Sequence, residues 1–251
     1  MDFNVKKPTH IIALLLILVT FILIIILPII TFFGFSPSTQ SLDYSDLPES
    51  YSLFFEIFVL FFQLVFVILL MVLFPFLWYI LVNDLKFKEI LSKLKLTFEK
   101  IELAFLWGII TAILIFLISF VIGIITIVIF KVDTQDISNI PDLEALFSPI
   151  TLFLLVAIQP VAEEIFFRGF LLDKLHSLAG RNIAIVSTAI LFGLAHATYL
   201  KVYAIILPMI MGVILAYIVI KTRNLNTAII AHVCFNVGSL ILTFLARSLM
   251  P

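Results

Sequence analysis

Charged residues are scarce in this chain, and glycine and cysteine are scarcer still. Only 12% of its 251 residues are charged, eight are glycine and one, Cys234, is cysteine. A single cysteine excludes an internal disulfide framework. The net charge of -1, without a basic patch, argues against a nucleic-acid partner.

Apolar residues take the place of the missing charges. The chain is 63% hydrophobic and its mean hydropathy is +1.28, whereas a soluble domain is about 45–50% apolar and about 25% charged. This composition is typical of an integral membrane protein. The length suits one membrane domain without a large water-soluble part.

Seven apolar runs are long enough to cross a bilayer as helices, at about 1.5 Å per residue. None alternates polar and apolar residues, so we expect an all-α polytopic bundle rather than a barrel. The first run lacks the cleavage site of a signal peptide and should be retained. Interior prolines at Pro28, Pro75 and Pro208 predict kinks. The predicted helices are Ile11–Phe33, Leu53–Val82, Leu103–Phe130, Pro149–Arg168, Ile183–Tyr199, Val202–Ile220 and Thr227–Leu245.

The basic residues indicate how the chain is oriented. Twelve of the fifteen lysines and arginines precede the first helix or lie in connections on the same side as the amino terminus, if Arg168 at the end of the fourth helix is counted, and the bias remains without it. By the positive-inside rule the amino terminus is cytoplasmic and the carboxyl terminus is outside. We expect a multi-pass protein of the cell membrane. Residues 83–102, between the second and third helices, could form an amphipathic surface helix or a solvated loop.

The predicted chemistry is confined to the second part of the chain. The first three helices carry no ionisable group in their apolar centres. We therefore divide the chain into a membrane scaffold with a cytoplasmic loop, residues 1–148, and a catalytic helical core, residues 149–251.

Glu163, Glu164 and Arg168 lie inside the apolar fourth helix. An ionisable group at membrane depth costs several kcal/mol unless it is paired or borders water, so such groups mark functional sites. Glu164 and Arg168 are four residues apart and can form an ion pair. Glu163 is rotated by about 100° from Glu164, which would let it point at the reacting centre. The spacing leaves open an exchange of roles between the two glutamates.

Two histidines follow on later helices. Counted from a turn at Arg181, Glu164 lies 17 residues before and His196 lies 15 after. In an antiparallel hairpin the two should lie at similar heights and meet. His232 and Asn236 share a helix face and could donate hydrogen bonds to an oxyanion or position a metal ligand. His232 is closer to its helix end, so the histidines meet only if the hairpin protrudes or the helices tilt.

These residues resemble the motifs of the CPBP family, the CAAX protease and bacteriocin-processing proteins, over about Pro149–Leu245. The resemblance implies an intramembrane endopeptidase acting on a lipidated, prenylated protein or on a small peptide. It implies that Glu163 activates water with help from His196, and that His232 and Asn236 stabilise the oxyanion. It also leaves two possibilities: zinc bound by Glu163, His196 and His232, or glutamate catalysis without an essential metal. The matching motifs are Glu163-Glu164-x-x-x-Arg168, Phe192-x-x-x-His196 and His232-x-x-x-Asn236.

The residues also allow other interpretations. Phe192 should pack beside the site rather than act chemically. Glu163, Glu164 and Arg168 could form a structural ion network. A non-hydrolytic bacteriocin-immunity or scaffolding protein could keep the same motifs. A proton-coupled transporter is a further alternative, although the sequence lacks the repeated halves common in transporters. For a protease, the scissile amide needs water, so the site must open to water, and by the charge bias we expect that opening to face the cytoplasm.

Overall fold

The computed structural model describes residues 3–34, 49–132, 140, 143 and 147–249. In this part of the chain all regular secondary structure is helical, which confirms the all-α prediction. Seven of its helical segments are long and apolar enough to span a membrane, and each overlaps one predicted helix. These spans are Pro8–Gly34, Leu53–Asn83, Ile101–Ile129, Pro149–Ala179, Arg181–Tyr199, Tyr203–Thr222 and Leu225–Leu249.

Several spans are built from more than one helical segment. In chain order the described elements are α1 (Pro8–Phe21), η1 (Ile22–Ile26), α2 (Leu27–Gly34), α3 (Glu49–Ile68), η2 (Leu69–Leu73), α4 (Phe74–Asn83), α5 (Phe87–Lys93), α6 (Ile101–Phe130), α8 (Pro149–Glu164), η4 (Ile165–Leu171), α9 (Leu172–Ala179), α10 (Arg181–Leu194), η5 (Ala197–Tyr199), α11 (Tyr203–Thr222) and α12 (Leu225–Leu249).

Wide π-helical turns accompany two of the three predicted proline kinks. η1 ends two residues before Pro28, and η2 ends two residues before Pro75. In each turn the hydrogen bond spans five residues, as from Leu27 N–H to Ile22 O. A proline already removes one bond from the helical ladder, so a wider turn beside it disrupts fewer further bonds. Pro208 lies within the uninterrupted helix α11.

The connection between the second and third spans contains a short amphipathic helix, α5. Its Ile90 and the following Leu94 are fully buried, whereas Phe87 is exposed. A methyl group on Gly169 would lie only 2.9 Å from Leu94 Cδ2, so this connection packs closely on the fourth span. Of the two possibilities for residues 83–102, the structure is nearer to the amphipathic helix.

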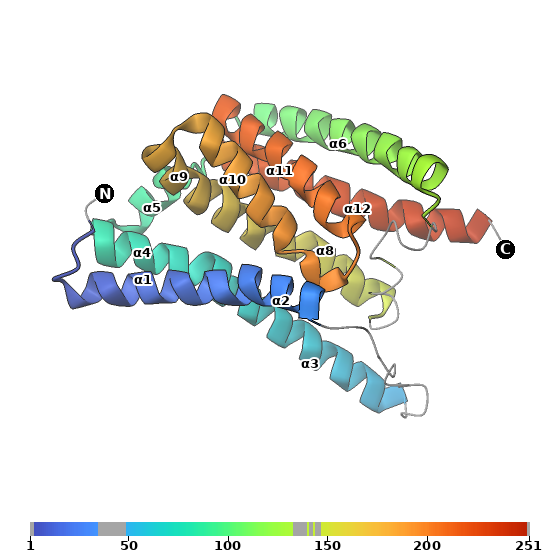
Figure 1. Cartoon of the computed structure of the whole chain (residues 1–251), viewed down its shortest axis with the longest axis horizontal. Helices are drawn as coiled ribbons and strands as arrows, with labels where there is room; N and C mark the ends of the chain where they lie inside the picture. Colours follow the sequence, from blue (N-terminus) through green and yellow to red (C-terminus); the bar gives the residue numbers. More distant parts are fainter. Residues whose placement is uncertain (1–2, 35–48, 133–139, 141–142, 144–146, 250–251) are drawn as a thin grey trace.

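The fourth span, formed by α8, η4 and α9, is the most deeply buried of the seven. Figure 1 shows it between the amino-terminal helices and the group formed by α10, α11 and α12. α6 lies at the edge of the bundle and packs on α12. The helix that carries the acidic pair is therefore enclosed by neighbours from both halves of the chain.

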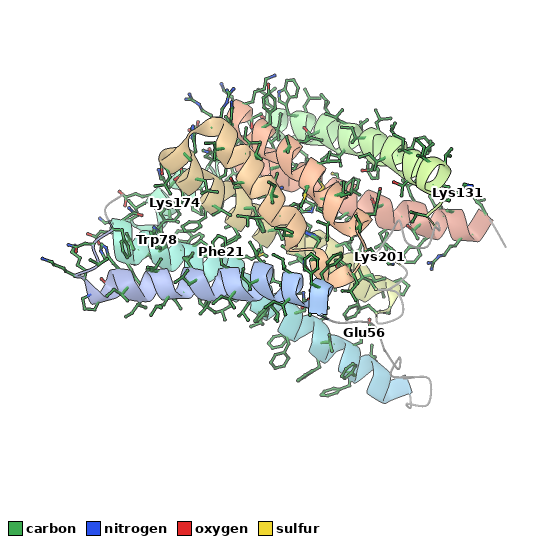
Figure 2. The ribbon with its side chains drawn as sticks, in the orientation of Figure 1. Phe21, Glu56, Trp78, Lys131, Lys174 and Lys201 are labelled. Carbon is green, nitrogen blue, oxygen red and sulfur yellow. The ribbon has the colours of Figure 1, made fainter. Side chains whose placement is uncertain are left out.

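Polar side chains gather at the two ends of the bundle. Trp78 and Lys174 lie toward one end, whereas Lys131, Lys201 and Glu56 lie toward the other (Figure 2). This separation agrees with the sides assigned from the sequence. Arg168 is different, because it is only 1% exposed and lies inside the bundle rather than in a loop. Without Arg168 the basic residues are still concentrated on the side of the amino terminus, so a cytoplasmic amino terminus stays the prediction.

Candidate active site

Glu164 and Arg168 form a fully enclosed ion pair on the fourth span. Arg168 Nη1 donates to Glu164 Oε1 over 2.6 Å, and the two side chains are 1% and 0% exposed. The bond connects the last turn of α8 to the π-helical turn η4 that follows it. π-helical turns occur frequently at functional sites, where they redirect side chains. This is the pair that the four-residue spacing predicts.

His232 reaches the same carboxylate from another helix. Its Nδ1 lies 2.8 Å from Glu164 Oε1, although the two residues are 68 positions apart in the chain. An ionised carboxylate can only accept a hydrogen bond, so Nδ1 is the donor. Glu164 thereby joins Arg168 to His232 and fixes the orientation of the imidazole.

Glu163 is arranged differently from its neighbour. Its Oε1 accepts a hydrogen bond of 2.7 Å from Gln159 Nε2, and its Oε2 lies 3.8 Å from His232 Nε2. Oε2 therefore faces the imidazole beyond ordinary hydrogen-bond distance. Glu163 Oε2 is therefore available for a further partner, whereas Glu164 Oε1 is shared between two donors and Glu164 Oε2, also without a hydrogen bond, is fully buried.

Gln159 is absent from the candidates that the sequence suggested. It lies four residues before Glu163, so the two side chains share a helix face. A polar residue one turn before a buried carboxylate in an apolar helix was the available signal. A neutral amide does not stand out among charged residues and histidines, so the sequence-based prediction lacked Gln159.

The carboxylates of the cluster outnumber its guanidinium. Two buried carboxylates face one guanidinium, which leaves one negative charge among Glu163, Glu164 and Arg168. An uncompensated charge in an apolar interior is costly. Since Nδ1 of His232 already donates to Glu164, donation from Nε2 as well would require the imidazolium form, whose charge would also balance the cluster.

His196 lies just beyond the end of α10 and is partly exposed. Its Nδ1 is 2.8 Å from the Phe192 carbonyl oxygen. A carbonyl only accepts, so Nδ1 carries the hydrogen and Nε2 of the neutral ring keeps a lone pair. Charge interactions also connect His196 with Glu163 and His232. His196 can thus accept a hydrogen bond from a water molecule near the acidic pair.

Phe192 packs between the other members of the cluster. Its ring centroid lies 4.9 Å from that of His196 and 5.7 Å from that of His232. The guanidinium carbon of Arg168 lies 4.1 Å from the same centroid. A cation over a desolvated aromatic ring is stabilised by the ring quadrupole. Phe192 therefore supports the buried arginine and both imidazoles.

His232 contacts Glu164 although the two residues lie at different distances from the ends of their helices. Glu164 lies 16 residues before Gly180, and His232 lies eight after Asn224. If the helices ran parallel, the turn between α9 and α10 would extend about 12 Å further than the turn between α11 and α12. The two residues nevertheless meet, which the sequence allows only with a protruding hairpin or with tilted helices. Asn236 lies one turn beyond His232 and is partly exposed.

In the part of the chain that the structure describes, no three His, Cys, Asp or Glu side chains are grouped as a metal site. Glu163, His196 and His232 are near one another without forming a ready set of three ligands. A zinc ion bound by these residues stays a prediction.

The comparisons with known proteins bear on the same region. Residues 145–238 match the family model described as type II CAAX prenyl endopeptidase Rce1-like. The matched region runs from just before α8 to the middle of α12, so it contains every residue of the cluster. It confirms the resemblance read from the three motifs. No curated protein matches the chain, and no solved structure does.

Proposed function

We propose that this protein is an intramembrane endopeptidase in which Glu163 activates a water molecule. The observation that carries this proposal is the unequal state of the two glutamates. Glu164 is enclosed between Arg168 and His232. Glu163 has an oxygen directed at the Nε2 of His232 without a short bond. A carboxylate with a free oxygen beside an imidazole suits general-base catalysis.

The proposed reaction begins with a water molecule that Glu163 deprotonates. His196 Nε2 accepts the second hydrogen of this water and orients it. The hydroxide adds to the scissile carbonyl carbon and gives a tetrahedral oxyanion, to which His232 and Asn236 donate hydrogen bonds. The C–N bond then breaks, and the proton taken by Glu163 passes to the leaving amine. All protons are thereby accounted for without another reactant.

Glu164 and Arg168 act as positioning residues in this scheme. Glu164 holds His232 by Nδ1, so that Nε2 faces Glu163 and the reacting oxygen. Arg168 holds Glu164 in place through their ion pair and is itself supported by the Phe192 ring. Residues that orient an imidazole contribute to catalysis without touching the substrate.

The family similarity extends the proposal to substrates. We infer a lipidated protein cleaved near its carboxyl terminus, of the CAAX type, or a small peptide. An apolar prenyl group could remain among the helices while the peptide reaches the acidic pair. Because the basic loops should lie in the cytoplasm, we expect the site to open toward the cytoplasm.

The proposal is tested with the purified full chain in lipid nanodiscs and a farnesylated peptide carrying a fluorophore beyond the cleavage point. The wild type should release the carboxyl-terminal fragment. Glu163→Gln should lower the rate by about 10²–10⁴-fold, the usual contribution of a general base. Full activity of this variant would remove the proposed base. No hydrolysis of prenylated or unprenylated peptides by folded wild type would favour a non-hydrolytic protein.

The predicted zinc ion has a separate test. If zinc takes part, exhaustive chelation should abolish fragment release and added zinc should restore it. When bound, zinc would polarise the scissile carbonyl and lower the pKa of water. Activity that survives chelation, with metal content verified by mass spectrometry, would count against an essential metal.

A further inference from the structure

A second candidate site lies away from the catalytic cluster. A cavity of about 450 Å³ opens where the start of α6 meets the turn between α11 and α12. Figure 1 shows these segments side by side at one end of the bundle, and Asn224 Nδ2 donates to Glu99 O across them. None of the residues lining this cavity belongs to the catalytic cluster.

The cavity is positively charged. Lys100, Lys221 and Arg223 line it and are exposed, against the single carboxylate of Glu99 among the lining residues. None of these three cations forms an ion pair within the described part of the chain. The Nζ of Lys221 instead lies 5.8 Å from the centroid of the Trp107 ring. Cations brought together without anionic partners favour an anionic ligand.

The inner end of the cavity has a hydrogen-bonding group without a partner. Thr227 lines the cavity and is fully buried, yet its Oγ1 has no hydrogen bond to any described residue. Such unpaired buried hydroxyls are uncommon and suggest a missing ligand. Thr227 is the third residue of α12, a helix of 25 residues. The positive end of the helix dipole adds to the attraction for an anion.

One side of the cavity is apolar. Leu103, Trp107 and Ile218 line the cavity on the side of α6 and α11. Trp107 is 40% exposed, and Phe98 just before α6 is 86% exposed. Exposed aromatic rings near the end of a membrane helix are typical of the lipid–water interface. A ligand here would meet cations at one end and hydrocarbon at the other.

We infer that this cavity binds the phosphate of an anionic membrane phospholipid. The phosphate lies among Lys100, Lys221 and Arg223 with the Thr227 hydroxyl, and an acyl chain follows Leu103 and Trp107. Basic pockets between membrane helices bind lipid headgroups in this way. This site is independent of the proposed protease activity.

Tryptophan fluorescence tests the inference directly, because the chain has only two tryptophans. The Trp78→Phe variant retains Trp107 as the reporter inside the cavity. In nanodiscs, brominated phosphatidylglycerol should quench Trp107 more strongly than brominated phosphatidylcholine at the same fraction. The combined variant Lys100→Gln, Lys221→Gln and Arg223→Gln should lose this preference, because each cation removed should lower the affinity for phosphatidylglycerol by about fivefold.

A matched control separates the site from overall charge. Lys6→Gln, Lys7→Gln and Lys88→Gln remove three exposed cations elsewhere and should keep the preference. Equal quenching by the two lipids, or an equal loss in both triple variants, would overturn the inference. Displacement of the brominated lipid by millimolar inorganic phosphate would reassign the site to a soluble phosphate. If Trp78→Phe does not fold, native mass spectrometry of retained phosphatidylglycerol gives the same comparison with Trp78 intact.

Discussion

His232 Nδ1 lies 2.8 Å from Glu164 Oε1, and this bond joins α12 to the fourth span. The same oxygen accepts the 2.6 Å bond from Arg168. These two bonds distinguish Glu164 from the adjacent Glu163, whose roles the sequence left interchangeable. Glu164 Oε1 is therefore tied into a buried network, whereas Glu163 Oε2 lies 3.8 Å from His232 Nε2 and is the oxygen to which we assign the base of the proposed reaction.

Substitution of Glu164 should therefore harm the fold, whereas substitution of Glu163 should not. Glu164→Gln leaves Arg168 buried without its counter-ion, and breaking a buried pair costs about 3–5 kcal/mol. We expect a lower midpoint of thermal unfolding for Glu164→Gln in nanodiscs. Glu163→Gln keeps the hydrogen bond from Gln159 through its amide oxygen and should unfold near the wild-type temperature. Equal midpoints for the two variants would contradict this division.

Gln159 should matter for activity through Glu163. Gln159→Ala removes the 2.7 Å hydrogen bond that fixes the Glu163 carboxylate. A carboxylate that samples other rotamers is less often aligned with water, so kcat should fall by about tenfold, the equivalent of one ordinary hydrogen bond. KM should change little, because Gln159 is not expected to contact substrate. The matched control is Gln63→Ala, an exposed glutamine on α3, which should leave the rate unchanged.

His196 should contribute through its Nε2 alone. Its Nδ1 is already bonded to the Phe192 carbonyl oxygen, so only Nε2 can accept a hydrogen bond from water. His196→Ala should reduce fragment release by about 10²-fold or more, and unfolding should be little affected because the ring is partly exposed. His196→Asn can keep a donor near the carbonyl but lacks the Nε2 base, so it should not restore the rate. Recovery of wild-type activity in His196→Asn would argue that the ring only packs.

Gly193 should be necessary for the contact between α10 and α11. A methyl group at this position would lie 2.2 Å from Met209 Cγ and 2.6 Å from the Ile205 carbonyl oxygen. Because one of these neighbours is backbone, the helices must separate, and overpacking typically costs about 1–3 kcal/mol. Gly193→Ala should lower the unfolding temperature and, by displacing His196, the activity. Gly34→Ala, which meets nothing within 4 Å, is the control and should be neutral.

Much of the site follows from local spacing that the sequence already contains. The pairing of Glu164 with Arg168 depends only on the helical repeat, and so does the shared face of His232 and Asn236. The likeness to the family also depends on motifs that are local along the chain. Gln159 belongs to this group, because its distance from Glu163 is a helical spacing too.

The sequence by itself determined that this is a membrane bundle of helices, where those helices run, and which ionisable groups lie within them. Apolar length and helical spacing are local properties, and lipid permits few other structures. Only the tertiary structure decided which glutamate binds His232, which nitrogen of His196 is free, and that Phe192 joins Arg168 to both histidines. These contacts connect helices far apart in sequence, so they depend on how the helices pack, which no local spacing specifies.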